Sequence, residues 1–161
     1  MKKKIAAVAV VTVMVMLMLT GCGAANLNRP AMEEGATPVT VTGSCQAYQD
    51  GDKLIVEGEC DLMTGTNGTV SVYSANGEKL ALEKITQTLG EKITYTFNIE
   101  DDWPEKVYGF ITFDTTQSDR QPDDVRAAYG KAMENLQGDN VIWDAKGIAV
   151  CFQSEEITIT K

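Results

Sequence analysis

The sequence predicts an all-β fold, an antiparallel β-sandwich, and three observations support this. Short segments alternate apolar and polar side chains with a period of two. Tight-turn dipeptides, Asp50-Gly51 and Asn76-Gly77, separate some of them, because these residues tolerate the positive φ angles of a hairpin. About seven such segments follow one another at regular spacing, which is typical of a sandwich.

The first residues of the chain predict a secretory signal peptide over residues 1–21. Lys2, Lys3 and Lys4 form a positive start, and Ile5–Leu19 is an almost unbroken apolar run. That run is about 15 residues long, shorter than the roughly 20 that a membrane-spanning helix needs. An ordinary transmembrane anchor is the alternative.

The end of this run, Leu19-Thr20-Gly21-Cys22, resembles the lipobox of bacterial prolipoproteins. The resemblance implies that Cys22 receives a diacylglyceryl group and becomes the first residue of the mature chain. Because two acyl chains anchor a protein stably, we expect it on the extracytoplasmic face of the cell membrane without a spanning helix. Hosts with one membrane or with two fit equally.

Residues 22–37 are expected to be the lipidated cysteine and a flexible tether, because they show no apolar period and contain Gly, Asn and Pro. A coil of about 15 residues would hold the domain on the order of 20 Å from the membrane. Residues 38–161 have the usual size of one domain.

Strands are expected, in chain order, at Val39–Ala47, Lys53–Cys60, Gly68–Ala75, Glu78–Ile85, Glu91–Ile99, Val107–Asp114 and Ile148–Thr160, the last as one strand or two. In the second of these, Glu57, Glu59 and Asp61 alternate, which predicts a solvent-facing or edge strand. This arrangement resembles the immunoglobulin-like and fibronectin-III-like modules of bacterial surfaces. The Cys…Trp…Cys spacing of antibody domains is missing, so the resemblance implies no function.

One stretch departs from the β pattern and predicts an insertion of helix and loop, about 115–147, before the final strand. Pro122-Asp123-Asp124 suits the first turn of a helix, and apolar residues then recur at helical spacing. We expect one helix over 122–137 that ends before Gly138, with Gly130 in its interior.

The same insertion is where we expect a partner to bind, because binding residues often lie on loops of a rigid scaffold. The candidate partner surface comprises Gln117, Arg120, Tyr129, Met133 and Trp143. Packing of Tyr129 and Met133 against the sandwich is the alternative use of these side chains.

Composition excludes several functions. Without residues 1–21, which hold three of the 14 basic residues and no acid, the chain carries 11 basic and 23 acidic residues, a formal charge of −12. Such a surface repels nucleic acid. There is no histidine, which removes the catalytic triads and histidine metal sites.

Acidic residues supply the remaining enzymatic or metal-binding hypotheses. Asp101-Asp102 with Glu105, Asp123-Asp124 and Glu155-Glu156 are paired carboxylates of the kind glycosidases use. Two sets could bind calcium, although neither has EF-hand spacing. They are Asp114, Asp119, Asp123 and Asp124, and Asp139, Asn140 and Asp144. We interpret these acids mainly as solvated surface, and expect no metal and no cofactor.

Three cysteines remain beside Cys22, and their pairing is open. Cys45 with Cys60 is the favoured disulfide, because both fall on apolar positions of one hairpin. A two-residue turn at Asp50-Gly51 would however set Cys45 opposite Val56, so that a bulge would be needed. Pairings with Cys151, or three buried thiols, are the alternatives.

Together these features predict a lipoprotein with a non-catalytic binding or structural role in the bacterial cell envelope, and an envelope protein or glycan as its partner. One alternative is a calcium-dependent carbohydrate-binding protein or glycan-acting enzyme that uses the acidic loops. Another is a subunit of a larger membrane assembly.

Overall fold

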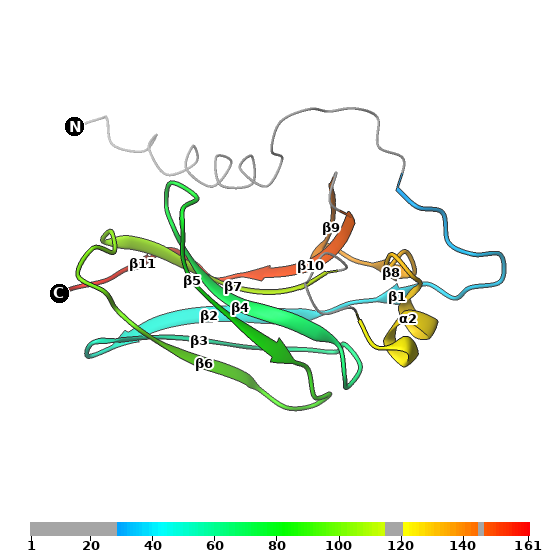
Figure 1. Cartoon of the computed structure of the whole chain (residues 1–161), viewed down its shortest axis with the longest axis horizontal. Helices are drawn as coiled ribbons and strands as arrows, with labels where there is room; N and C mark the ends of the chain where they lie inside the picture. Colours follow the sequence, from blue (N-terminus) through cyan, green and yellow to red (C-terminus); the bar gives the residue numbers. More distant parts are fainter. Residues whose placement is uncertain (1–28, 115–120, 145–146) are drawn as a thin grey trace, which may run out of the picture.

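The computed structural model describes residues 29–114, 121–144 and 147–161, and in them the predicted all-β sandwich is confirmed (Figure 1). The strands are β1 (Val39–Thr40), β2 (Gly43–Asp50), β3 (Lys53–Cys60), β4 (Asn67–Ser74), β5 (Lys79–Thr86), β6 (Ile93–Asn98), β7 (Lys106–Asp114), β8 (Leu136–Gln137), β9 (Val141–Asp144), β10 (Gly147–Gln153) and β11 (Ile157–Thr158). The helix α2 (Asp123–Tyr129) lies between β7 and β8.

Two antiparallel sheets face each other. The large sheet has the order β5-β4-β7-β10-β9, and β11 pairs with the start of β7. The small sheet has the order β2-β3-β6. A short parallel ladder of β1 with β8 lies at one end of the sandwich, beside α2 (Figure 1).

The core lies between the inner faces of the sheets, as the period-two alternation requires. The small sheet contributes Leu54 and Val56, both completely buried. The large sheet contributes Val70, Ile111 and Val150, which are also completely buried. Burying a side chain of this size stabilises the fold by about 1.5–3 kcal/mol, so the sheets hold together mainly through these residues.

The first expected strand, Val39–Ala47, is two strands in the structure. The first, β1, pairs with β8, and the second, β2, pairs with β3. Thr42 stands at the break, where Asp61 accepts hydrogen bonds of 2.8 Å from its backbone nitrogen and from its hydroxyl. In return the Asp61 nitrogen donates to the Thr42 carbonyl at 3.1 Å. The carboxylate of Asp61 therefore fixes this corner.

Two of the three alternating acids, Glu57 and Glu59, lie in β3, which is the central strand of the small sheet and not an edge. Glu59 is exposed to solvent. Glu57 is only 8% exposed, because Gln46, Tyr48 and Lys92 hydrogen-bond to its carboxylate. The Lys92 nitrogen lies 2.7 Å from Glu57 Oε1, and this pair holds the pKa of Glu57 below its usual range.

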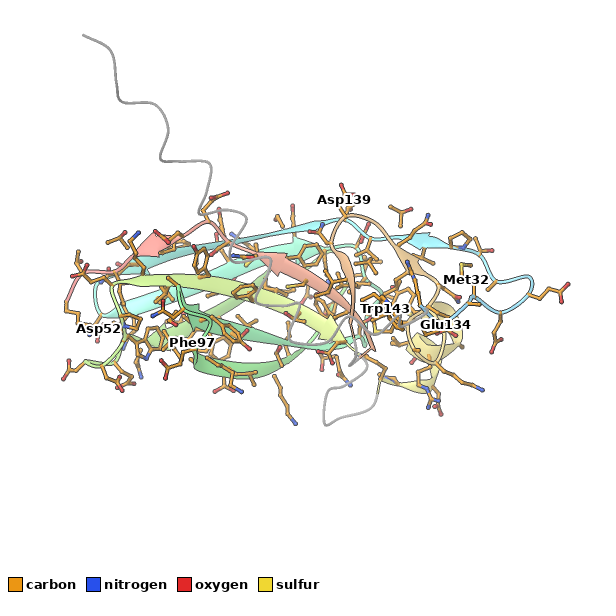
Figure 2. The ribbon with its side chains drawn as sticks, turned by 90° about the horizontal axis from the view of Figure 1, so that it is seen from above. Met32, Asp52, Phe97, Glu134, Asp139 and Trp143 are labelled. Atoms are coloured by element: carbon orange, nitrogen blue, oxygen red, sulfur yellow. The ribbon has the colours of Figure 1, made fainter. Side chains whose placement is uncertain are left out.

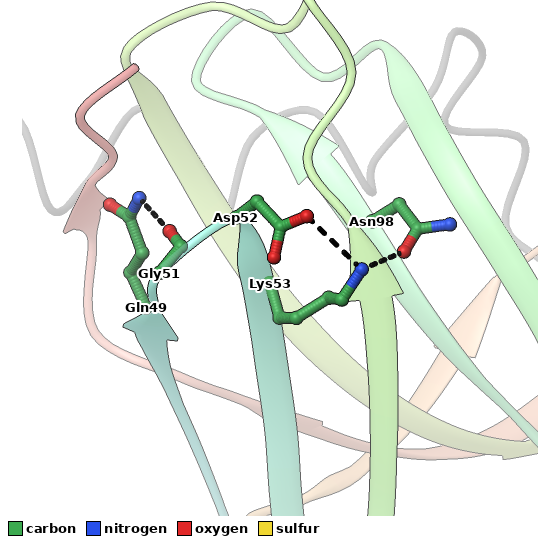
Figure 3. A network of polar contacts seen from close by, with 5 residues as sticks. All are labelled: Gln49, Gly51, Asp52, Lys53 and Asn98. Atoms are coloured by element: carbon green, nitrogen blue, oxygen red, sulfur yellow. Dashed lines mark hydrogen bonds and ion pairs between the residues drawn. The ribbon is translucent and has the colours of Figure 1, made fainter.

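The hairpin between β2 and β3 turns one residue later than the sequence predicts. Asp50 pairs with Lys53, so the two-residue loop is Gly51 and Asp52, with Gly51 at φ +60°. Lys53 Nζ lies 3.3 Å from Asp52 and 2.6 Å from Asn98 Oδ1, which ties the loop to β6 (Figure 3).

The insertion contains less helix than predicted, and the expected helix over 122–137 is wrong beyond Tyr129. Gly130 adopts φ +87° and ends α2, and Met133 adopts φ +58° in the turn that follows. The chain then forms β8 and β9 before β10. The pattern of apolar residues continues past Gly130, but a left-handed residue cannot continue the helix.

Figure 2 shows the two ends of the sandwich: Met32, Glu134 and Trp143 lie at one end and Asp52 at the other. The first is called the insertion end, defined by α2, β1 and β8. The second is the hairpin end, defined by the Gly51-Asp52 turn.

Candidate binding cleft

The N-terminal segment of the described chain is bound to the insertion by backbone hydrogen bonds. The Val39 nitrogen donates to the Asn135 carbonyl at 2.8 Å, and the Val41 nitrogen donates to the Gln137 carbonyl at 2.9 Å. These bonds form the parallel ladder of β1 with β8. They join residues almost one hundred positions apart in sequence.

Arg29 extends this attachment toward the N-terminus. Its guanidinium Nη2 donates to the carbonyl oxygens of Leu136 and Glu134, the latter at 3.4 Å. Residues 29–38 form no helix or strand, and Ala36 donates to the Glu33 carbonyl in a turn at 3.0 Å. The second half of the expected tether therefore lies along the insertion end.

Two members of the predicted partner surface belong to the core instead. Tyr129 is 4% exposed, and its hydroxyl accepts a 2.7 Å hydrogen bond from the Met63 nitrogen. Met133 is 1% exposed, which its left-handed backbone makes possible by turning the chain inward. Burial also raises the pKa of Tyr129. The partner-surface prediction is wrong for both residues, and their alternative use as packing residues is confirmed.

The structure describes only one of the other three predicted surface residues. Trp143 is half-buried and lies opposite Ile148, a core residue, so its ring packs at the margin of the core. Gln117 and Arg120 lie outside the described residues.

A cleft of about 680 Å³ lies between the N-terminal segment and α2. One wall is the turn of residues 33–37, and the opposite wall carries Arg126, Lys131 and Glu134. Its volume falls within the range of about 300–1,000 Å³ typical of ligand sites. A smaller hollow of about 340 Å³ is lined by Arg29, Met32 and the residues of β8.

Charges of both signs line the cleft. Lys131 is exposed, Arg126 is half-buried, and Arg126 lies 3.7 Å from the exposed carboxylate of Asp123. Glu33 and Glu34 contribute two further exposed carboxylates from the N-terminal wall. A partner that carries both amino and carboxylate groups would find complementary charges here.

Asn135 is one of the residues that line the cleft, and one of its polar atoms has no partner among the described residues. Its Nδ2 donates to the Ala128 carbonyl at 3.2 Å, and the residue is 8% exposed. Among the described residues nothing donates to its Oδ1. A buried amide oxygen without a hydrogen bond costs about 1–3 kcal/mol, which a donor from outside the described chain would recover.

The acidic residues do not gather into a metal site within the described residues. No three carboxylate or cysteine side chains of this part of the chain lie close enough to hold an ion. Asp119 and the side chain of Asp144, which belong to the two expected calcium sets, lie outside what the structure describes.

The cysteine pairing expected from the sequence, Cys45 with Cys60, is not formed: these residues and Cys151 are thiols. Cys45 pairs with Gly58 and Cys60 pairs with Gly43, so the two side chains are diagonal neighbours. Diagonal neighbours lie about 7–8 Å apart, too far for a disulfide. Burial raises the pKa of Cys45 to about 12 and also raises that of Cys60 and Cys151, so the thiols stay protonated at neutral pH.

Sequence patterns miss most of this cleft. Residues 33–37 have no apolar period, and Arg126, Lys131 and Glu134 are ordinary surface residues of an expected helix. The alternation runs without a break from Val39 to Ala47, so no local signal marks the ladder of β1 with β8.

In the part of the chain that the structure describes, no helix has the length and apolar character to cross a membrane. Comparison with protein-family models, curated proteins and solved structures gives no match to this chain.

Proposed function

We propose that this chain is a lipid-anchored protein of the extracytoplasmic membrane face that binds an envelope partner, without catalysis, in the cleft at its insertion end. The proposal of the anchor rests on the lipobox-like Leu19-Thr20-Gly21-Cys22. The proposal of the binding site rests on the cleft between the N-terminal segment and α2.

One observation carries the proposal: the anchored segment itself builds a wall of the cleft. Cys22 precedes Arg29 by seven residues, which reach about 25 Å when fully extended. Arg29 is held against β8, so a chain anchored at Cys22 keeps its insertion end close to the membrane. The partner would then be a membrane or cell-wall component with charges of both signs, such as an envelope protein or a peptide-bearing glycan.

Site-specific photo-cross-linking in intact envelopes tests the binding site. A benzophenone amino acid placed at Lys131, in the cleft wall, should give a discrete adduct, and adding Arg126→Glu should remove it. The same probe at Lys79, an exposed lysine at the start of β5, is the matched control. Equal adducts from both positions, or an adduct unchanged by Arg126→Glu, would rule out a specific partner in this cleft.

A further inference from the structure

The exposed edge of the small sheet is formed by β6, and its sequence is unusual for an edge. No described strand pairs with its outer side, and it forms the lower rim of the molecule in Figure 1. Ile93–Asn98 contains no charged residue. Proteins usually protect such edges with charge, because free N–H and C=O groups invite another strand.

The other sheet edges differ from β6. Edge strand β5 carries Lys79, Glu83 and Lys84, and β9 has only four residues. Edge strand β2 is bound to the C-terminal segment, since Gln49 Oε1 accepts from the Thr160 nitrogen at 2.8 Å and Gln49 Nε2 donates to the Thr160 carbonyl at 2.7 Å.

The register of the small sheet determines which backbone groups of β6 are free. The Ile99 nitrogen donates to the Asp52 carbonyl at 2.9 Å, in line with the pairing of β6 with β3. Because hydrogen-bonded and non-hydrogen-bonded pairs alternate along an antiparallel ladder, Tyr95 and Phe97 direct their backbone groups to β3. Thr94, Thr96 and Asn98 then direct theirs outward.

We propose that β6 pairs antiparallel with β6 of a second copy of this chain, around a two-fold axis at Thr96. Thr96 would face Thr96 of the second copy, Thr94 would face Asn98, and by symmetry Asn98 would face Thr94. Each of these three pairs exchanges two backbone hydrogen bonds, about six in all, and joins the two small sheets into one continuous sheet.

Charge complementarity selects a second copy and this register. The pairing sets Lys92 opposite Glu100 of the second copy, at both ends of the joined strands. Lys92 and Glu100 are exposed, and Lys92 already contacts Glu57 on the same face. On the inner face, Tyr95 would lie beside Phe97 of the second copy; within one chain these two rings are 4.7 Å apart.

The pairing is compatible with two anchored chains but does not depend on the anchor or the cleft. A two-fold axis perpendicular to the small sheet presents the same broad face of both copies to one side, with the two insertion ends apart. Such a small interface predicts a weak dimer, whose population rises when a membrane confines the chains.

Cysteine cross-linking of the full chain in its membranes tests this pairing. With a short bismaleimide, Thr96→Cys should give a covalent dimer at least fivefold more abundant than Thr94→Cys, because residue 94 faces residue 98 of the second copy. An equal mixture of Thr94→Cys and Asn98→Cys chains should give about half the dimer of Thr96→Cys, because only the dimers with one chain of each kind place the two thiols opposite each other. Adding Glu100→Lys to Thr96→Cys should reduce the dimer at least fivefold, whereas Glu105→Lys, the same charge change away from β6, should not.

Two results would overturn the proposal. One is a Thr96→Cys yield no higher than that of Thr94→Cys, in chains whose far-ultraviolet circular dichroism matches the wild type. The other is a Thr96→Cys yield that Glu100→Lys and Glu105→Lys leave equally unchanged.

Discussion

Tyr129 shows how a single side chain decides between a binding surface and a core. Its ring packs into the core and its hydroxyl accepts the Met63 N–H, so it joins α2 to the segment after β3. Tyr129→Phe should destabilise the fold by about 1–2 kcal/mol, because it leaves a buried donor unpaired, and Tyr129→Ala by about 3–5 kcal/mol. Urea unfolding of the full chain in detergent measures both, and wild-type midpoints would contradict the core assignment.

Glu156 predicts a pH dependence of stability. Lys106 Nζ, 2.6 Å from Glu156 Oε1, and the Tyr108 hydroxyl, 3.0 Å from Oε2, hold the pKa of Glu156 below its ordinary 4.5. The folded-state pKa is below the unfolded one, so ionised Glu156 stabilises the fold above pH 4.5. This contribution is lost as the pH falls through the folded-state value.

The measurement compares wild type with Glu156→Gln by urea unfolding between pH 7 and pH 3. The variant should be less stable at neutral pH, and the difference should shrink below about pH 4.5. Glu155→Gln, at an exposed neighbouring position, is the matched control. A difference that is the same at every pH would exclude the ion pair as its cause.

A substitution at Gly130 distinguishes two structures of the insertion, a continuous helix and the observed helix that ends at Gly130. Within a continuous helix, Gly130→Ala would stabilise the protein by about 1 kcal/mol. In the structure Gly130 has φ +87°, and an added Cβ would lie 2.3 Å from the Glu134 carboxylate. We therefore expect destabilisation of at least about 1 kcal/mol.

Gly90→Ala is the control for this substitution. Gly90 has a similar φ of +83°, but nothing lies within 4 Å of its added Cβ. The free energy of unfolding that Gly130→Ala loses in excess of Gly90→Ala measures the unfavourable contact with Glu134. A Gly130→Ala variant more stable than the wild type would contradict the observed turn and support one helix over 122–137.

The elements differ in how well the sequence predicts them, and the reason is the range of the interactions that form them. Strands such as β3 and β7 are predictable because alternation along the strand records which face is buried. The end of the helix is not predictable in this way, because the apolar period continues through Met133 while the backbone turns at Gly130. The Gly51-Asp52 turn shifts by one residue, a difference that local composition does not encode.

The cleft depends on contacts between residues far apart in sequence, which no local sequence pattern predicts. Val39 and Asn135 meet through a backbone hydrogen bond, and Arg29 reaches the Leu136 carbonyl. Chain segments this far apart in sequence come together only in the finished sandwich. The sequence predicts a partner surface at the insertion that includes Tyr129 and Met133, whereas the structure buries both residues and forms a cleft beside them.

The proposed lipid anchor and the cleft together indicate how the molecule would lie at the membrane. The insertion end would lie close to the membrane, because Arg29 at this end is only seven residues from Cys22. This placement beside the membrane requires that the mature chain begin with an acylated Cys22.

The most direct test is the intact mass of the protein extracted from membranes. We expect a chain that begins at Cys22 and carries the added mass of a diacylglycerol, and a Cys22→Ser variant that keeps residues 1–21 and gains no lipid. A wild-type mass that retains Met1–Gly21 without lipid would contradict the anchor, and with it the placement of the cleft beside the membrane.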